Sequence, residues 1–517
     1  MSLFTSDTKQ KFNKDVSVDS SLGRGVTSIE RAKKELFYKP PRIDPITKIK
    51  TNNENYYGED HFTKEPYYIN DNEVTHEILV GSTGTGKGVL IGNRVYEAIQ
   101  KRKGVIIIDP KQDAFLPQIC KEALEKQGRI DDFQVVSFPN NFGYSGINEF
   151  DTAKEVANKF IVMLGLEPSV DAAIDYYRKN SRVALLKILK MFFDGSLGVV
   201  VKKDFTDILK HIRFLKEDLE KQELYEKELS KTKPNANLLN KYSKRFYDTN
   251  LIDAQYWETT DVQTLDSLSK SLAEIAAAGK IFSKYTLEGA LYQNKVLYVK
   301  ADMLDIASLK LIKMLITDAI IQAKNKKANT VIIADELSFY ANSTISGALA
   351  TIRHLGIKFI LALQDLAQIE AGLREAILSN CNLKIFYKIS DKLTLEWVEK
   401  IGGKELISKF TKKDNETIIN QDIEDNLNAT RLRALPRAGT AIVIAEAENT
   451  TKIIDTNFIA VSREFDWDKY NKPSAKQTLK SIDEKIKTEN YKVFVKEKKE
   501  ILKDSDLFAF EFDSLAI

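Results

Sequence analysis

The segment with the clearest chemical pattern is the glycine-rich stretch GSTGTGKG at Gly81–Gly88. It matches the pattern G-x-x-x-x-G-K of phosphate-binding loops. Glycines let backbone N–H groups turn inward around phosphates, a following helix adds its positive N-terminal end, and the lysine amine reaches the terminal phosphate oxygens. The pattern therefore predicts a nucleotide-binding loop made of Gly81, Ser82, Thr83, Gly84, Thr85, Gly86, Lys87 and Gly88.

One position of this loop departs from the usual pattern. The serine or threonine that normally follows the lysine, and whose hydroxyl binds Mg²⁺, is Gly88 here. Metal binding must then depend on phosphate oxygens, water molecules and a carboxylate from elsewhere in the chain. A glycine-rich turn that serves only strand–helix packing is the alternative explanation of the whole motif.

Two acidic residues follow the apolar stretch Thr330–Ala334. Asp335 and Glu336 would therefore lie at the carboxyl edge of a sheet, where ligands bind in α/β folds. We expect Asp335 to hold the Mg²⁺ shell through water and Glu336 to act as the general base toward the attacking water. A solvated acidic strand end is the alternative. Asp109, which follows the apolar stretch 105–108, is a further candidate for the metal, with an ordinary turn residue as its alternative.

Two more side chains could contact the nucleotide. Gln364 ends the apolar stretch 358–363 and could hydrogen-bond the γ-phosphate or its water; a satisfied loop amide is the alternative. Arg353 lies in the helical stretch 346–355 and could face the nucleotide of a neighbouring subunit, where it would stabilise transition-state charge. An ordinary surface cation is the alternative for Arg353.

These residues need a parallel sheet to bring them together, and the hydrophobic pattern predicts one. From His76 onward, short apolar stretches alternate with helical ones. Continuous apolar strands separated by helices are typical of a parallel sheet that is covered on both faces. The predicted strands lie at 77–80, 105–108, 134–138, 296–299, 330–334, 358–363, 383–387 and 440–445.

The alternation stops between residues 151 and 280, where helical periodicity continues almost without strand signals. We therefore predict an α/β domain that an all-helical insertion divides. The predicted segments are a polar, loosely structured lead-in at 1–70, the α/β domain at 71–150 and 281–460, the insertion at 151–280, and a charged tail at 461–517 with helical stretches at 472–503.

Composition excludes several classes of protein. The 517 residues include 77 Lys and Arg against 74 Asp and Glu, which excludes a uniformly basic nucleic-acid coat protein but not a local basic channel. Two cysteines and four histidines argue against a disulfide scaffold and against a zinc site. No apolar run approaches the ~20 residues of a membrane-spanning helix, and the N-terminus has no signal-peptide core. We therefore expect a cytoplasmic protein.

Several motifs together resemble one family. The stretches GSTGTGKGVL, VIIIDPKQD, VIIADELSF and ATIRHLGIKFILALQDLAQI, followed by SNCNLKIFYKISD, are similar to type IV coupling proteins of bacterial conjugation and secretion. These are the TraD, TrwB and TraG relatives within the FtsK/HerA group of P-loop motors. The resemblance covers residues 68–448 in order. It implies a RecA-like P-loop NTPase domain with an inserted all-α domain.

The resemblance also implies roles for residues and for partners. Lys87 becomes the phosphate lysine, Asp335 and Glu336 the pair for Mg²⁺ and water, Gln364 the sensor glutamine, and Arg353 an arginine finger that acts on a neighbouring subunit. The family implies an ATPase with ATP and Mg²⁺, a homo-hexameric ring around DNA, and coupling of a relaxase–DNA complex to a secretion channel. Glycine after the loop lysine is familiar in the TraG-like branch.

The sequence departs from the family at its N-terminus, because family members usually begin with transmembrane helices and this chain shows none. We therefore expect a membrane-anchored partner and a peripheral place at the inner membrane of a bacterium. The main expectation is an ATP-driven DNA translocase of a secretion or conjugation machine. A soluble HerA/FtsK-like DNA-processing motor, and a nucleotide-gated cargo adaptor with little hydrolysis, stay open as alternatives.

Overall fold

The computed structural model describes residues within 44–467. The described ranges are 44–111, 114–139, 142–144, 146–148, 151–193, 205–244, 257, 261–276, 282–283, 286–402, 404–413, 416–425, 432–433, 435 and 438–467. The first part of the predicted lead-in and the helical stretches expected at 472–503 lie outside these ranges.

The chain divides into two compact units. The first, called the sheet unit here, joins the chain up to Ser137 with Leu287–Ile312 and Asp318–Tyr470. The second, called the helical unit, contains Phe138–Thr286 and the short segment Lys313–Thr317. The boundaries between the units thus fall at 137/138 and 286/287. The sequence pattern predicted boundaries at 150/151 and 280/281.

The centre of the sheet unit is a set of parallel strands in the order β11-β3-β10-β9-β4-β8-β5. Their residues match the predicted strands to within two residues at each end. Every residue of β4 and β9 is buried, which confirms that both faces of the sheet are covered. The bounds are β3 (Glu77–Val80), β4 (Gly104–Asp109), β5 (Phe133–Ser137), β8 (Val296–Lys300), β9 (Thr330–Ala334), β10 (Ile357–Leu363) and β11 (Leu383–Phe386).

Antiparallel strands extend this sheet beyond β11, in the order β14, β15, β1 and β2. The bounds are β14 (Thr440–Ala445), β15 (Thr450–Asp455), β1 (Glu54–Asp60) and β2 (Pro66–Asn70). The interpretation of residues 54–70 as loosely structured lead-in is therefore wrong. The stretch ENYYGED has almost no aliphatic residues, but Tyr56 and Tyr57 are fully buried, and Tyr57 Oη donates to Glu77 Oε1 at 3.0 Å.

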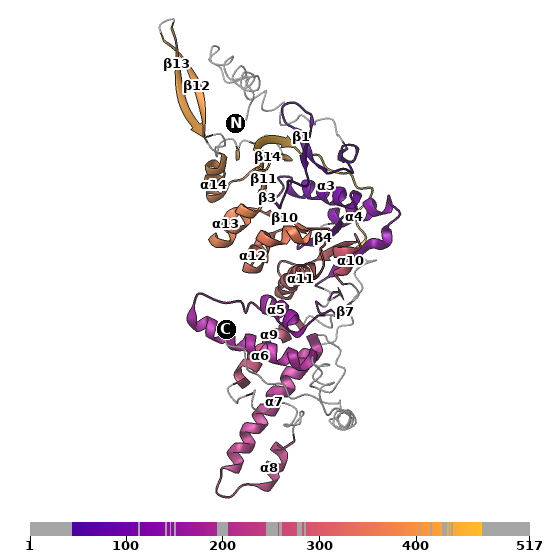
Figure 1. Ribbon diagram of the computed structural model, residues 1–517, viewed down its shortest axis with the longest axis vertical. Helices are drawn as coiled ribbons and strands as arrows, with labels where there is room; N and C mark the ends of the chain where they lie inside the picture. The colour runs from indigo at the N-terminus through magenta and orange to yellow at the C-terminus, as the bar shows by residue number, and fades with distance from the viewer. Residues whose placement is uncertain are drawn as a thin grey trace. The chain divides into compact units, whose positions relative to one another are not determined.

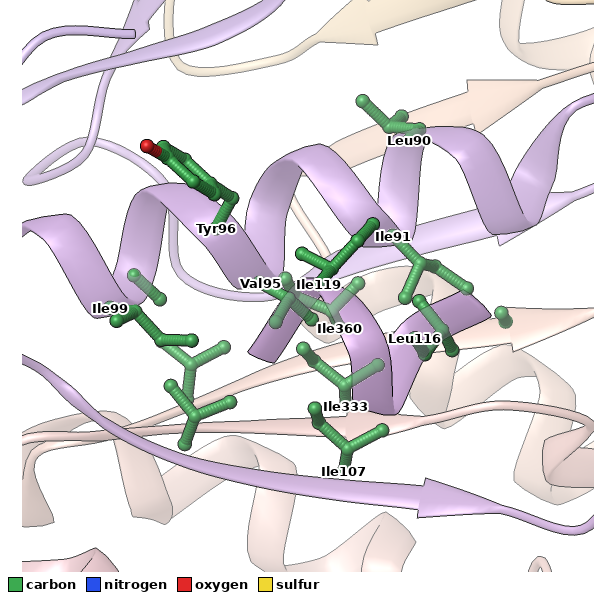
Figure 2. Close-up of a cluster of buried hydrophobic side chains, with 14 of the residues drawn as sticks. Leu90, Ile91, Val95, Tyr96, Ile99, Ile107, Leu116, Ile119, Ile333 and Ile360 are labelled. Carbon is green, nitrogen blue, oxygen red and sulfur yellow. The ribbon is translucent and has the colours of Figure 1, made fainter. Parts of the chain in front are cut away.

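Helices cover the two faces of the sheet (Figure 1). α3 (Lys87–Gln100) and α4 (Phe115–Glu125) lie on one side, and α12 (Ser343–Ile352) and α13 (Ala371–Asn380) lie on the other. Figure 2 shows apolar side chains of α3 and α4 facing those of the strands below them. The labelled residues of this cluster are Leu90, Ile91, Val95, Tyr96, Ile99, Ile107, Leu116, Ile119, Ile333 and Ile360. Burial of this apolar surface fixes α3, and with it the loop that precedes α3.

The remaining helices of the sheet unit are α10 (Glu288–Tyr292), α11 (Ile306–Asn325) and α14 (Lys392–Gly402). Within α11, the segment Lys313–Thr317 belongs to the helical unit. Short 3-10 turns occur at Pro45–Thr47, Ile130–Asp132, Leu337–Phe339, Arg353–Leu355 and Leu366–Gln368. After α14, β12 (Lys404–Lys413) and β13 (Glu416–Asp425) form a separate two-stranded antiparallel hairpin, which the sequence pattern did not predict.

The helical unit contains the predicted amphipathic helices. α5 (Ala153–Met163) begins with a capping box in which Thr152 and Glu155 satisfy each other's backbone amides. It is followed by α6 (Ala172–Phe193), α7 (Phe205–Leu229), α8 (Ala236–Tyr242) and α9 (Asp261–Ala276). In the described part of this unit the strands are the two-residue β6 (Phe142–Gly143) and β7 (Phe282–Ser283), which pair with each other.

Among the helices that the structure describes, none combines the length and the apolar character needed to cross a membrane.

Candidate nucleotide site

The glycine-rich loop connects β3 to α3 at the carboxyl edge of the parallel strands. Gly84 and Gly86 have left-handed backbone angles, φ of 77° and 114°, which glycine adopts without strain. Within the described chain, the amides of Thr83, Gly84, Gly86, Lys87 and Gly88 donate to no other protein group. The loop thus has a cluster of unpaired N–H donors at the first turn of a 14-residue helix, as phosphate binding requires.

Two residues far away in the sequence fix the shape of this loop. Gly439, which precedes β14, donates its N–H to Thr85 O at 2.8 Å. A Cβ on Gly86 would lie 2.8 Å from Gly439 Cα, and a Cβ on Gly81 would lie 2.6 Å from Tyr387 Cβ. Gly81 and Gly86 are therefore required by close packing as well as by loop geometry. Sequence reasoning missed Tyr387 and Gly439, because only the order of strands in the sheet brings them to the loop.

Lys87 places its charge inside the loop. Its side chain is buried, and its Nζ donates to Gly81 O and, at 3.4 Å, to Ser82 O. Burial lowers the pKa of Lys87, and the nearby charge of Glu336 opposes that shift. A buried ammonium group that donates to neutral carbonyls favours an anionic ligand. Together with the free amides, Lys87 forms a donor set that fits a nucleotide phosphate chain.

Gly88 is exposed, and a Cβ at this position would meet no other atom within 4 Å. Packing therefore does not dictate the glycine, and a hydroxyl-bearing side chain would fit there.

Asp335 and Glu336 lie directly after β9, on the same edge of the sheet as the loop. Both side chains are buried, and Glu336 has a left-handed backbone with φ of 48°, which is uncommon for a residue other than glycine. Tyr340 Oη donates to Asp335 O at 2.6 Å, and Glu336 N donates to Asp335 Oδ1 at 3.0 Å. Burial raises the pKa of the Asp335 carboxyl, and Lys111 opposes this shift. A buried acid with a strained backbone, such as Glu336, and a buried acid with a shifted pKa, such as Asp335, are typical of functional sites.

Gln364 contacts this acidic pair. Its Nε2 lies 3.3 Å and 3.4 Å from the two carboxylate oxygens of Glu336. β10 and β9 are neighbours in parallel register, so their carboxyl ends bring Gln364 to Glu336. The structure therefore brings together Lys87, which was predicted from the glycine-rich motif, and Asp335, Glu336 and Gln364, which were predicted from their places at strand ends.

Lys111 also belongs to this cluster, and sequence reasoning missed it. Its Nζ lies 3.2 Å from Asp335 Oδ2 and 2.5 Å from Glu336 Oε1. Asp109, the other candidate for the metal, is fully buried: its Oδ1 accepts from Lys111 N at 2.8 Å, and its Oδ2 accepts from Tyr298 Oη. Asp109 thus holds a turn, which favours the alternative interpretation. The motif VIIIDPKQD contains this lysine. Its position two residues after the end of a strand could have predicted that Lys111 lies at the same edge of the sheet.

Arg353 does not join this cluster. It lies before β10, at the amino edge of the parallel strands, whereas Gln364 follows β10 at the carboxyl edge. Its exposed side chain donates to Asn72 O at 3.0 Å. Within one chain Arg353 is therefore separated from the loop by the length of β10, and its role as an arginine finger stays a prediction about a neighbouring subunit.

Metal binding at this site would rest on few protein ligands. Over the described residues, no group of three or more His, Cys, Asp or Glu side chains is arranged to hold a metal ion by itself. Asp335 is the carboxylate that fits Mg²⁺, because it lies at the carboxyl edge beside the phosphate loop. Mg²⁺ commonly keeps several waters and takes its other ligands from substrate phosphates, so one protein carboxylate is compatible with it.

Comparison with known proteins supports the resemblance seen in the motifs. The family model described as "TraM recognition site of TraD and TraG" matches residues 329–437, about a fifth of the chain. The type 4 coupling protein DotL of Legionella pneumophila is 32% identical over 84 residues, which are 16% of this chain and 11% of DotL. The aligned part therefore spans a small fraction of that relative.

Solved structures of the bacterial conjugative coupling protein TrwBΔN70 share the fold. The unbound form has a TM-score of 0.54 at 15% identity and covers 83% of this chain and 95% of that one. The complex of TrwB with ADP and Mg²⁺ has a TM-score of 0.52 at 14% identity, with the same coverage. The fold is thus a RecA-like P-loop NTPase domain with an all-α insertion. By sequence in residues 329–437 and by fold over most of its length, this chain resembles the type IV coupling proteins, as its motifs predicted.

Proposed function

We propose that this protein is an ATP-hydrolysing DNA motor that couples a DNA substrate to a type IV secretion or conjugation machine. The observation that carries the proposal is the buried carboxylate of Glu336, which Gln364 and Lys111 contact on the sheet edge that bears the phosphate loop. A phosphate-binding loop alone supports binding. A buried, oriented carboxylate at the same edge of the sheet, after β9, adds the general base that hydrolysis requires.

In this proposal the cofactors are ATP and Mg²⁺, which supply the reactive phosphoanhydride and its metal charge when bound. Lys87 and the free loop amides hold the phosphates. Asp335 orients the hydration shell of the metal, and Glu336 accepts a proton from the attacking water. Gln364 contacts the Glu336 carboxylate and is placed to respond when its proton state or its orientation changes.

The assembly that we propose is a homo-hexameric ring around DNA. The exposed guanidinium of Arg353, on the opposite edge of the sheet from the loop, supports a role toward a neighbouring copy. DNA contacts through phosphates would be largely independent of sequence and sensitive to salt. The match of residues 329–437 to a model described as a TraM recognition site supports docking of a relaxase complex or secretion component on this part of the sheet unit. In this proposal the docking takes place at the bacterial inner membrane.

The test compares ATP turnover and nucleotide binding, with and without DNA, in Lys87→Ala, Glu336→Gln and the control Lys327→Met. Lys327 is exposed at the amino edge of β9, away from the loop. We expect DNA to stimulate wild-type and Lys327→Met turnover. Glu336→Gln should keep nucleotide affinity and lose about 100-fold or more in turnover, because only the proton acceptor is removed. Lys87→Ala should lose nucleotide affinity. If Lys87→Ala and Glu336→Gln both kept the DNA-stimulated ATP turnover of the wild type, the proposal would be contradicted.

Gly88 favours a second function, a nucleotide-gated cargo adaptor with little hydrolysis, because the loop lacks the usual metal-binding hydroxyl. Deletion of the C-terminal tail should then abolish cargo binding. The deletion should begin at Asn471 rather than at Arg463, because Trp467 packs against the ring of Tyr298 and Phe465 packs against Phe133. If the shortened chain still binds cargo and hydrolyses ATP, the motor is retained and the adaptor is excluded.

A further inference from the structure

We propose that Lys111 is a positioning residue of this site: its ammonium group orients the Glu336 carboxylate and supplies the positive charge that the Asp335–Glu336 pair needs when no metal is bound. The proposal rests on the proposed ATPase function for its kinetic consequence. Its structural consequence can be measured without any nucleotide.

The backbone holds Lys111 in reach of both acids. β4 and β9 are parallel neighbours, with Ile108 opposite Ala334, and Asp335 N donates to Ile108 O at 3.2 Å. The turn after β4 is fixed because the buried Asp109 carboxylate accepts both Lys111 N and Tyr298 Oη. The start of the Lys111 side chain is therefore fixed relative to the end of β9.

The contacts of Glu336 come from the two strands on either side of β9. Lys111 follows β4 and approaches one carboxylate oxygen of Glu336 to 2.5 Å. Gln364 follows β10 and lies at 3.3 Å and 3.4 Å, which are long distances for hydrogen bonds. The lysine therefore makes the closer, charge-assisted contact, and it is the stronger determinant of how the carboxylate is oriented.

Charge gives Lys111 its second role. Asp335 and Glu336 are adjacent and their side chains are 8% and 1% exposed, so two like charges are buried together. Burial lowers the pKa of Lys111, but the Asp335 and Glu336 carboxylates outweigh it and raise that pKa overall. The other nearby cation, Lys87, donates instead to the carbonyls of its own loop. In the described structure Lys111 is thus the cation that contacts both carboxylates.

The Lys111 side chain is itself 36% exposed, so it has room to move. A lysine on an exposed stem can release Asp335 when a metal–nucleotide complex arrives and still hold Glu336. A purely structural ion pair would instead make the same contribution to stability with and without a divalent cation. This difference separates the two roles.

The experiment compares Lys111→Met, which keeps the stem and removes the charge, with Lys111→Arg and with the control Lys327→Met. Melting temperature is measured without nucleotide, with and without millimolar Mg²⁺. Because the uncompensated carboxylates of Lys111→Met accept another cation, we expect Mg²⁺ to raise its melting temperature at least about 2 °C more than it raises that of wild type. Lys111→Arg and Lys327→Met should respond to Mg²⁺ as wild type does.

Steady-state kinetics are the second measurement. Lys111→Met should lower kcat about 10- to 100-fold with KM for ATP changed less than about 3-fold, and Lys111→Arg should recover most of the loss. Wild-type kcat in Lys111→Met, or a Mg²⁺ response equal to that of wild type, would overturn the proposal. If the wild-type protein hydrolyses no ATP, the proposed function fails, and the melting experiment still decides the role of Lys111 as counter-charge.

Discussion

The substitution Gly439→Ala tests whether a residue outside the motif maintains the phosphate loop. Gly439 has φ of 94°, its N–H donates to Thr85 O, and its carbonyl accepts from both Thr456 N and Thr456 Oγ1 at 2.8 Å. A Cβ at this position would lie 2.9 Å from Thr456 O, a backbone atom that cannot rotate away. The added methyl group must therefore move either the start of β14 or the phosphate loop.

The expected cost has two parts. A left-handed backbone at a residue with a Cβ costs roughly 1–2 kcal/mol, and forcing a methyl group into a close contact costs about 1–3 kcal/mol. We therefore expect Gly439→Ala to lower the free energy of unfolding by roughly 2–5 kcal/mol. If the hydrogen bond to Thr85 is lost as the backbone shifts, nucleotide affinity should fall about tenfold or more, which corresponds to 1.4 kcal/mol.

The assay combines urea unfolding with titration of a fluorescent ATP analogue, and Gly347→Ala is the matched control. Gly347 is exposed in α12, and a Cβ there would meet nothing within 4 Å. The same chemical change should therefore stabilise the protein by about 0.5–1 kcal/mol and leave nucleotide affinity unchanged. Wild-type stability and affinity in Gly439→Ala would refute the reasoning that this glycine supports the loop.

Two further substitutions test the site and the core. Gly88→Ser should restore a hydroxyl next to Lys87 without any clash and tighten Mg²⁺-dependent ATP binding about tenfold or more; equal binding with and without the hydroxyl would show that it adds no ligand. His76, whose ring accepts from Phe359 N and lies 3.0 Å from Leu349 O, has its pKa lowered to about 4 by burial. In the unfolded chain the pKa of His76 is about 6.5, so below that pH the unfolded state binds more protons than the folded state. The free energy of unfolding should therefore fall by about 2 kcal/mol between pH 7 and pH 5. In urea unfolding, His76→Gln should flatten this pH dependence. An unchanged slope in His76→Gln would contradict this assignment.

The sequence predicts the parallel part of the fold well, because every strand there is a short, mostly apolar stretch. The same rule predicts which polar residues meet. Asp335, Glu336 and Gln364 each follow such a stretch directly, and the structure brings them together. One periodic signal therefore predicts both the sheet and the side chains at its edge.

Residues were missed where burial does not follow from hydrophobicity or from nearness in sequence. β1 is a strand rich in tyrosines and acids. Some of its buried polar atoms have partners in α3 and β3, for example Tyr56 N with Glu97 Oε1 at 3.1 Å. No period-two apolar pattern marks such a strand. Gly439 contacts the loop because β14 is antiparallel to β11, so the start of β14 lies at the carboxyl edge of the sheet. That pairing joins positions far apart in the chain and leaves no local signal.

The charges at the site explain why a motor of this design would act as an assembly. The charges of Lys87 and Lys111 offset those of Asp335 and Glu336, so these four residues together carry no net positive charge for a further anion. A nucleotide with bound Mg²⁺ is still an anion, and the free loop amides and the N-terminus of α3 stabilise only part of its charge. The transition state of phosphoryl transfer is commonly stabilised by a further cation. Arg353, exposed at the far edge of the sheet, cannot supply that charge to its own loop and is free to supply it to a neighbour's. In our proposal a ring is therefore part of the catalytic device, since each copy would complete the charge balance of the next.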